Sequence, residues 1–99
     1  MKVRKTLIKA IDTWGVDMQL NIAVEEFAEL TKEICKYKRG ADNISNIVEE
    51  MADCYIMLEQ MKVMFGLGSA IISDEMYKKI ERLKVRLATH PTEKGGVEG

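Results

Sequence analysis

Apolar side chains recur at helical spacing along most of this chain, and glycines interrupt the recurrence at three places. The interruptions fall at Gly15, at Gly40 and in the segment 66–69, which reads GLGS. This pattern predicts helices joined by short turns, because glycine readily ends a helix that buries one apolar stripe. The only proline stands at position 91, so none interrupts the periodic segments. The fold class that we expect is all-α, a bundle of about four helices.

The ends of the expected helices follow from these breaks and from capping residues. The first ends at Trp14, the second starts near Met18 and ends before 38–43, and Asp42 or Asn43 can cap the third. A fourth is expected from Ser73 through residue 88, because Ser73 offers a capping oxygen and acids follow it. The apolar residues expected to face inward are Leu20, Ala23, Val24, Phe27, Leu30, Ile34 and Tyr37 on the second helix, and Ile44, Ile47, Val48, Met51, Tyr55, Leu58 and Phe65 on the third.

The domain organisation that we predict is one helical domain over residues 1–88, followed by a disordered tail over 89–99. The last ten residues, HPTEKGGVEG, contain three glycines and no apolar periodicity. His90, the only histidine, belongs to this tail. We do not expect it to be a catalytic group, because a mobile side chain is not held in a reactive geometry.

Size and charge narrow the class of protein further. A monomer of 99 residues leaves much apolar surface in water, so a homodimer or homotetramer is expected. The formal net charge of −1 gives no overall attraction to nucleic acid or to an acidic membrane. We expect no signal or anchor segment, because the apolar residues near the N-terminus are periodic and form no long uncharged run. Cys35 and Cys54 both lie in helical patterns, which favours small buried thiols in a reducing, cytoplasmic protein over a disulfide framework.

Two similar acidic stretches carry the chemical signal: VEEFAEL over 24–30 and VEEMADC over 48–54. Glu26 and Glu29 are three residues apart beside the apolar stripe of the second helix, and Glu50 and Asp53 repeat this placement on the third. If the two helices form an antiparallel hairpin, as their short connection favours, the four carboxylates converge at the seam.

An ordinary solvated surface is the alternative interpretation of these acids. It suits the second helix, where Lys32 and Lys36 stand within one turn of Glu29. It suits the third helix poorly, because the bases nearest to its acidic stretch in sequence are Arg39 and Lys62. A hard divalent cation, Mg²⁺ or its substitute Mn²⁺, would neutralise the third helix's acids with oxygen ligands.

Other metals fit less well, and magnesium indicates phosphate chemistry. Two cysteines and a tail histidine do not make a zinc site, and the Glu-x-x-His motif of di-iron bundles is missing. Magnesium on carboxylates commonly neutralises phosphate oxygens and activates water, so a polyphosphate substrate is expected. Trp14 either packs in the core or offers a ring on which a nucleobase can stack. The basic residues that could reach the phosphates, or could simply be solvated surface, are Lys78, Lys79, Arg82 and Arg86.

Glu26-x-x-Glu29 is followed, after a gap of 20 residues, by Glu50-x-x-Asp53. This spacing resembles that of the MazG-like nucleotide pyrophosphohydrolases of the all-α NTP pyrophosphatase superfamily. The likeness extends from about Trp14 to Leu87. It implies that these four acids hold magnesium. It also implies a nucleotide contact for four further residues, Trp14 and Gln19 at the base or sugar and Lys79 and Arg86 on the last helix. Leu83 departs from the family pattern, because an asparagine commonly stands at that place.

The activity that this resemblance implies is magnesium-dependent hydrolysis of a nucleoside triphosphate to the monophosphate and pyrophosphate. Glu25 or Glu49 is the candidate for orienting the attacking water, and either is alternatively a partner of the metal ligands. A non-enzymatic helical module that binds a basic partner remains open. So does a relative that binds nucleotide without cleaving it.

Overall fold

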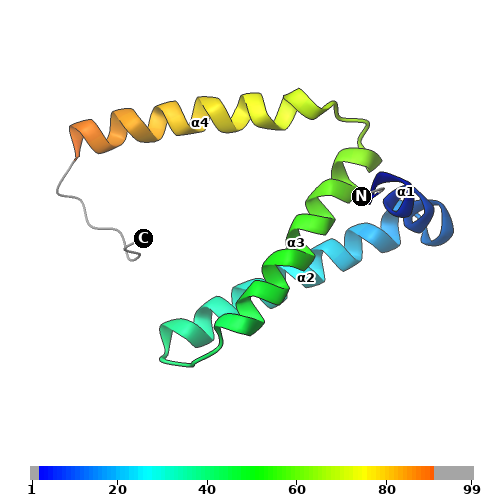
Figure 1. Cartoon of the computed structure of the whole chain (residues 1–99), viewed down its shortest axis with the longest axis horizontal. Helices are drawn as coiled ribbons and strands as arrows, with labels where there is room; N and C mark the ends of the chain where they lie inside the picture. The colour runs from blue at the N-terminus through cyan, green and yellow to red at the C-terminus, as the bar shows by residue number, and fades with distance from the viewer. Residues whose placement is uncertain (1–2, 91–99) are drawn as a thin grey trace. The chain divides into compact units, whose positions relative to one another are not determined.

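The structure is a computed structural model that describes residues 3–90, and these residues contain four α-helices and no strand (Figure 1). The expectation of an all-α fold is therefore confirmed. The first compact unit ends at Leu67 and the second begins at Gly68. Most of the predicted tail, residues 91–99, lies outside the described residues. The helices are α1 Val3–Trp14, α2 Val16–Lys38, α3 Ile44–Met64 and α4 Ser69–Thr89.

Glycines separate the first three helices where the sequence predicted. Gly15 alone stands between α1 and α2, with a φ of 88° that favours glycine. Its N–H donates to the carbonyl of Ile11 at 2.7 Å, and its own carbonyl accepts from the N–H of Gln19 at 3.1 Å. Gly40, with a φ of 99°, follows the end of α2. The helices therefore change direction at residues that tolerate left-handed backbone.

The start of α4 differs from the prediction. The helix begins at Ser69, four residues before Ser73, directly after the extended backbone of Gly68. The Ser73 hydroxyl does not cap the helix, because it donates to the carbonyl of Ala70 at 3.1 Å within the helix itself. The acids after Ser73 consequently lie beyond the first turn, where Glu75 pairs with Lys78 at 3.4 Å.

The α2–α3 hairpin positions the candidate site. Its two helices are antiparallel, and contacts fix their register at two levels. The thiol of Cys54 donates to the carbonyl of Glu26 at 3.5 Å. Near the turn, Asn43 Nδ2 donates to the carbonyl oxygen of Glu33 at 2.9 Å and to its Oε1 at 3.2 Å. Asn43 precedes α3 as predicted, but its side chain binds α2 instead of capping α3.

Glu33 is a buried acid that this turn stabilises in its charged form. The hydrogen bond from Asn43 lowers the pKa of Glu33, although burial acts in the opposite direction. Lys36, whose Nζ lies 3.2 Å from the Glu33 carboxylate, and Asn46 also favour the ionised group. The contact therefore joins the end of α2 to the start of α3 through a charge-assisted hydrogen bond.

The core is smaller than the sequence predicted. Four hydrophobic residues are buried among those described, namely Leu7, Ala23, Cys54 and Met57. Cys35 is exposed, contrary to the expectation of two buried thiols. α2 and α3 cover each other along one strip, and the shorter α1 contacts both, so the wide apolar arcs of α2 and α3 remain largely uncovered. The residues predicted to face inward that are exposed instead are Val24, Ile34, Tyr37, Ile44, Val48, Met51, Tyr55, Leu58 and Phe65.

The hydropathy of the described helices is also informative. None of them combines the length and the apolar character that crossing a membrane requires.

Candidate metal centre

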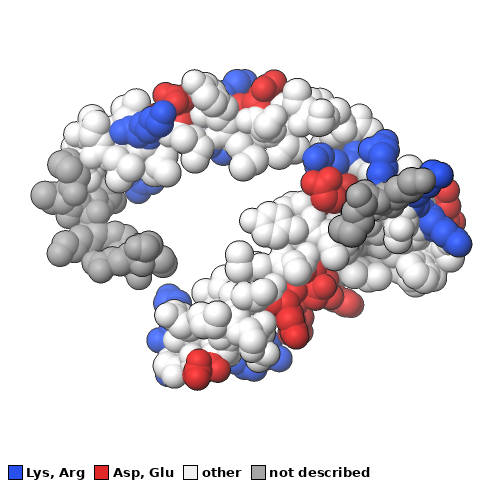
Figure 2. Space-filling model, in the orientation of Figure 1, with Lys and Arg blue, Asp and Glu red and all other residues white. Residues whose placement is uncertain are grey.

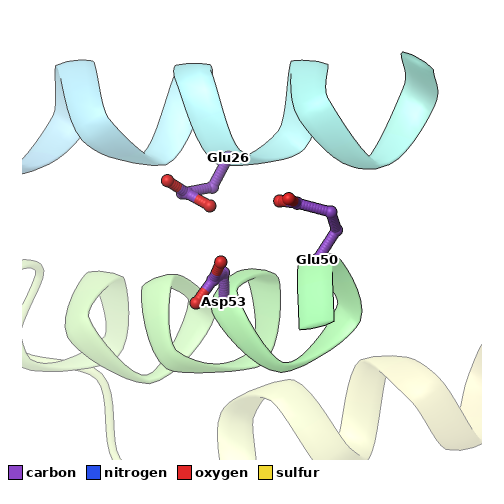
Figure 3. Close-up of side chains that lie close together, drawn as sticks. All are labelled: Glu26, Glu50 and Asp53. Atoms are coloured by element: carbon purple, nitrogen blue, oxygen red, sulfur yellow. The ribbon is translucent and has the colours of Figure 1, made fainter. Parts of the chain in front are cut away.

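Three of the four predicted ligands come together across the α2–α3 seam. Glu26 points from α2 toward Glu50 and Asp53 on α3 (Figure 3). Each residue offers one carboxylate oxygen, and these oxygens all lie within 4.8 Å of one another. Glu26 and Glu50 are half-buried, and Asp53 is partly exposed. The hairpin thus gathers three acids at one place with access from solvent.

Glu29, the fourth predicted ligand, is not in this group. It is exposed, and its carboxylate lies 4.0 Å from Lys32 Nζ on the same helix. One turn from Glu26, it shares that side of α2, but its pairing with Lys32 is the one expected of ordinary surface. Its role as a ligand stays a prediction.

The charged form of Glu26 is disfavoured at this place, and a bound cation would oppose that effect. The pKa of Glu26 is raised, first by partial burial and then by a hydrogen bond and charge repulsion from Asp53, with a smaller effect of Glu50. Burial and the same three acids raise the pKa of the adjacent Cys54 thiol. Partial burial and the neighbouring negative charges therefore both disfavour the ionised form of Glu26.

A buried oxygen at the centre lacks a partner. Glu50 Oε2 is inaccessible to water and has no hydrogen-bond donor among the described residues. Orphaned buried acceptors are rare in folded proteins, since leaving one unpaired costs free energy. Across the described chain, no basic side chain forms a salt bridge with Glu26, Glu50 or Asp53. Carboxylate oxygens on rigid helices are the donor set that hard divalent cations prefer, so these residues fit such an ion.

The candidate water-orienting residues flank this group. Glu25 and Glu49 each precede a clustered acid by one residue, and both are exposed. Neither has a carboxylate oxygen in the group of three. Their roles as a base or as a partner of the ligands stay predictions.

Trp14 and Gln19, the residues expected near the base or sugar, have contrasting surroundings. Trp14 ends α1 with 58% of its surface exposed, so it is not a core residue of this chain and its ring is accessible. Gln19 is only 3% exposed, and its Nε2 has no acceptor among the described residues. A nucleotide contact by Gln19 therefore requires movement of the groups that cover it.

Gln60 is a buried polar residue that the sequence reasoning missed. It is 3% exposed, and its Oε1 lacks a donor in the described part of the chain. The antiparallel register set by Glu26 and Cys54 places it at the same end of the hairpin as Gln19. Its spacing could have indicated burial, because Gln60 follows Asp53 and Met57 along one line of α3, at intervals of four and three residues.

The predicted phosphate-binding residues lie on α4, in the second unit. Lys79 and Arg86 are exposed and seven residues apart, which places them on the same side of the helix with Leu83 between. Lys78 pairs with Glu75. Contact of Lys79 or Arg86 with a phosphate stays a prediction.

The comparisons with known proteins found no match for this chain. No known family matches the chain. No curated protein matches it either. No solved structure matches it.

Proposed function

We propose that this protein is a MazG-like, magnesium-dependent nucleoside triphosphate pyrophosphohydrolase that acts as a homodimer or homotetramer in the cytoplasm. The convergence of Glu26, Glu50 and Asp53 supports this proposal most strongly. The carboxylates come from two helices, and one of their oxygens is buried without a donor. Such a group is better explained as a site for Mg²⁺, with Mn²⁺ as a substitute, than as an ordinary solvated surface.

The reaction is hydrolysis of a phosphoanhydride bond. Water forms a new bond to phosphorus, the bond to the bridging oxygen breaks, and the products are the nucleoside monophosphate and pyrophosphate. When bound, magnesium supplies positive charge to the phosphate oxygens and favours deprotonation of water. The protein's part is to hold the substrate in line and to accept the proton of the water.

The residues divide between these tasks. Glu26, Glu50 and Asp53 hold the cation, and Glu29 joins them on rotation away from Lys32. Glu25 or Glu49 orients water, since each lies next to a ligand and is exposed. Lys79 and Arg86 stabilise charge on the leaving pyrophosphate. Trp14 and Gln19 contact the base or sugar.

The test is pyrophosphate release from a panel of common and modified nucleoside triphosphates, with and without Mg²⁺. We expect release from at least one nucleotide, and its loss in Glu50→Gln with the helical circular dichroism intact. Glu59→Gln is the matched control, because Glu59 is an exposed acid on α3 that pairs with Lys62 at 3.2 Å outside the group. Activity that survives in a Glu50→Gln, Asp53→Asn double variant would contradict the proposal.

Two non-enzymatic functions remain distinguishable. An interaction module that binds a basic partner through this acidic surface would show no Mg²⁺-dependent stabilisation. A nucleotide-binding relative without activity would be stabilised by Mg²⁺ and nucleotide, yet release no pyrophosphate. Thermal melts combined with the release assay separate both from the hydrolase.

A further inference from the structure

The α2–α3 hairpin has an apolar groove that contains none of the three clustered acids. The groove has a volume of about 280 Å³ and lies entirely within the first unit. It opens to solvent between the two helices, and aromatic rings contribute to its lining. Its lining residues are Phe27, Leu30, Met51, Cys54, Tyr55 and Leu58.

Helix geometry places this groove across the seam from the carboxylates. Cys54 points into the seam, where its thiol meets the Glu26 carbonyl. Asp53 and Tyr55 are each about 100° around the helix from Cys54, in opposite directions. Asp53 therefore lies on one side of the seam and Tyr55 on the other. In Figure 2 the acidic side chains gather along one side of the α2–α3 pair, while much of the other side is uncharged.

The groove is part of a larger surface, which we call the apolar face. On α2 it extends one turn back from Phe27 to Val24 and two turns on to Ile34, both exposed. On α3 it extends from Met51 back to Val48 and Ile44, which are also exposed. Between these ends, no charged residue occupies the shared helical positions. The apolar face comprises Val24, Phe27, Leu30, Ile34, Ile44, Val48, Met51, Tyr55 and Leu58.

We propose that the apolar face binds the same face of a second copy of this chain across a two-fold axis. The two hairpins then form a four-helix core, and each carboxylate group lies on an outer side, complete within its own chain. This inference extends the proposed function by naming the residues that form the interface of the proposed oligomer. It rests on the apolar face alone and does not require the hydrolase activity.

Charge and width favour a second copy as the occupant. Two identical faces that carry no charge meet without like-charge repulsion, and the apolar face meets this condition. The face is two helices wide, and α2 alone is about 34 Å long at 1.5 Å per residue. A single helix such as α4 covers one groove, whereas a second hairpin covers both helices. Isologous contact of this kind is the commonest basis of homodimers.

The area is also of the right order. Full burial of an aliphatic or aromatic side chain removes roughly 60–250 Å² from water. Seven of the nine residues of this face have exposed fractions between 42% and 67%. The face therefore offers on the order of 500 Å² per copy, against about 800 Å² for a standard interface with its polar rim.

Sedimentation equilibrium of three proteins tests the proposal. The wild type is expected to sediment as a dimer, with twice the chain mass of 11.3 kDa. Tyr55→Glu places a charge in the face and should weaken dimerisation at least about ten-fold, as loss of a central aromatic contact commonly does. Tyr77→Glu is the matched control, because Tyr77 on α4 is similarly exposed, at 69% against 65% for Tyr55. A monomeric wild type, or equal effects of both substitutions, would overturn the proposal.

A second measurement remains decisive if Tyr55→Glu does not fold. The thiol introduced by Met51→Cys lies within the face, whereas that introduced by Val85→Cys lies on α4. Site-resolved alkylation at Met51→Cys should slow as protein concentration rises through the dimerisation range, and that at Val85→Cys should not. Protection of Met51→Cys at concentrations at which the protein sediments as a monomer indicates coverage by the same chain, and equal concentration dependence at both sites indicates another interface. Either result overturns the proposal, and neither bears on metal binding or pyrophosphate release.

Discussion

Removing the Glu50 carboxylate should change stability in opposite directions without and with magnesium. Its ligand oxygen lies within 4.8 Å of those of Glu26 and Asp53. Two unit charges at that distance repel by about 0.9 kcal/mol in water and about 3.5 kcal/mol at an effective dielectric constant of 20. Because the group is only half-buried, we expect Glu50→Gln to raise the metal-free unfolding free energy by about 1 kcal/mol.

With magnesium the order should reverse. A cation at 100 times its dissociation constant adds about 2.7 kcal/mol to the stability of the wild type. Glu50→Gln removes a charged ligand and should lose most of this gain. In a domain of this size about 1 kcal/mol corresponds to about 4–8 °C in Tm. The Tm of Glu50→Gln should therefore be above that of the wild type without Mg²⁺ and below it with Mg²⁺.

Thermal unfolding followed by circular dichroism, with and without Mg²⁺, measures both effects. The control Glu59→Gln removes an equal charge from α3 but breaks an exposed ion pair with Lys62. It should cost under about 1 kcal/mol in both conditions and keep the Mg²⁺-dependent shift. A Glu50→Gln variant that is less stable without metal, or that keeps the full shift with metal, would refute the reasoning.

Three further predictions concern neighbouring groups. The Mg²⁺-dependent rise in Tm should shrink as pH falls toward the raised pKa of Glu26, because a protonated carboxyl does not bind the cation; melts across a pH series measure this, and a constant rise would contradict it. Asn43→Ala should cost about 1–3 kcal/mol in urea unfolding by removing the hydrogen bonds to Glu33. Because Asn43 lowers the pKa of Glu33, that cost is present above the ordinary value of 4.5 and declines as pH falls below it, and a cost that grows in acid would be inconsistent. Gln19→Met should be neutral or stabilising, since it removes an unpaired buried amide, while weakening nucleotide binding in equilibrium dialysis; unchanged binding would exclude Gln19 from the site.

The helices and their first two junctions could be predicted because the signals are local. Gly15 and Gly40 end apolar periodicities, and both adopt the left-handed backbone that glycine favours. The start of α4 was placed wrongly because Ser73 and the acids after it imitate a capping sequence. Gly68 precedes the helix instead, and a serine within a helix can donate to its own backbone as Ser73 does.

The sequence could predict that the acids lie beside the seam, but not which of them come close together. Spacing places Glu26 and Glu29 beside the seam, but the distance across it depends on register, which the contact of Cys54 with the Glu26 carbonyl fixes. That register brings Glu26 into the group and leaves Glu29 beside Lys32. Local spacing does not determine this difference.

The core could not be predicted because periodicity identifies an apolar arc and not what covers it. Tyr55 and Leu58 belong to the predicted inner face of α3, yet both are exposed. The buried apolar residues of α3 are Cys54 and Met57, on a neighbouring line of the helix. An apolar arc wider than one neighbouring helix can cover points to a further contact, which we assign to a second copy.

Paramagnetic broadening by Mn²⁺ tests most directly whether the carboxylates of α2 and α3 hold a divalent cation. In a titration of ¹⁵N-labelled protein, the amide signals of Glu26, Glu50 and Asp53 should broaden first, at a defined stoichiometry, and excess Mg²⁺ should restore them. The signals of Glu59 and Glu75, acids paired with lysines elsewhere, should persist. Broadening spread evenly over all acidic residues would contradict a metal centre at the hairpin seam, and so would broadening that Mg²⁺ does not reverse.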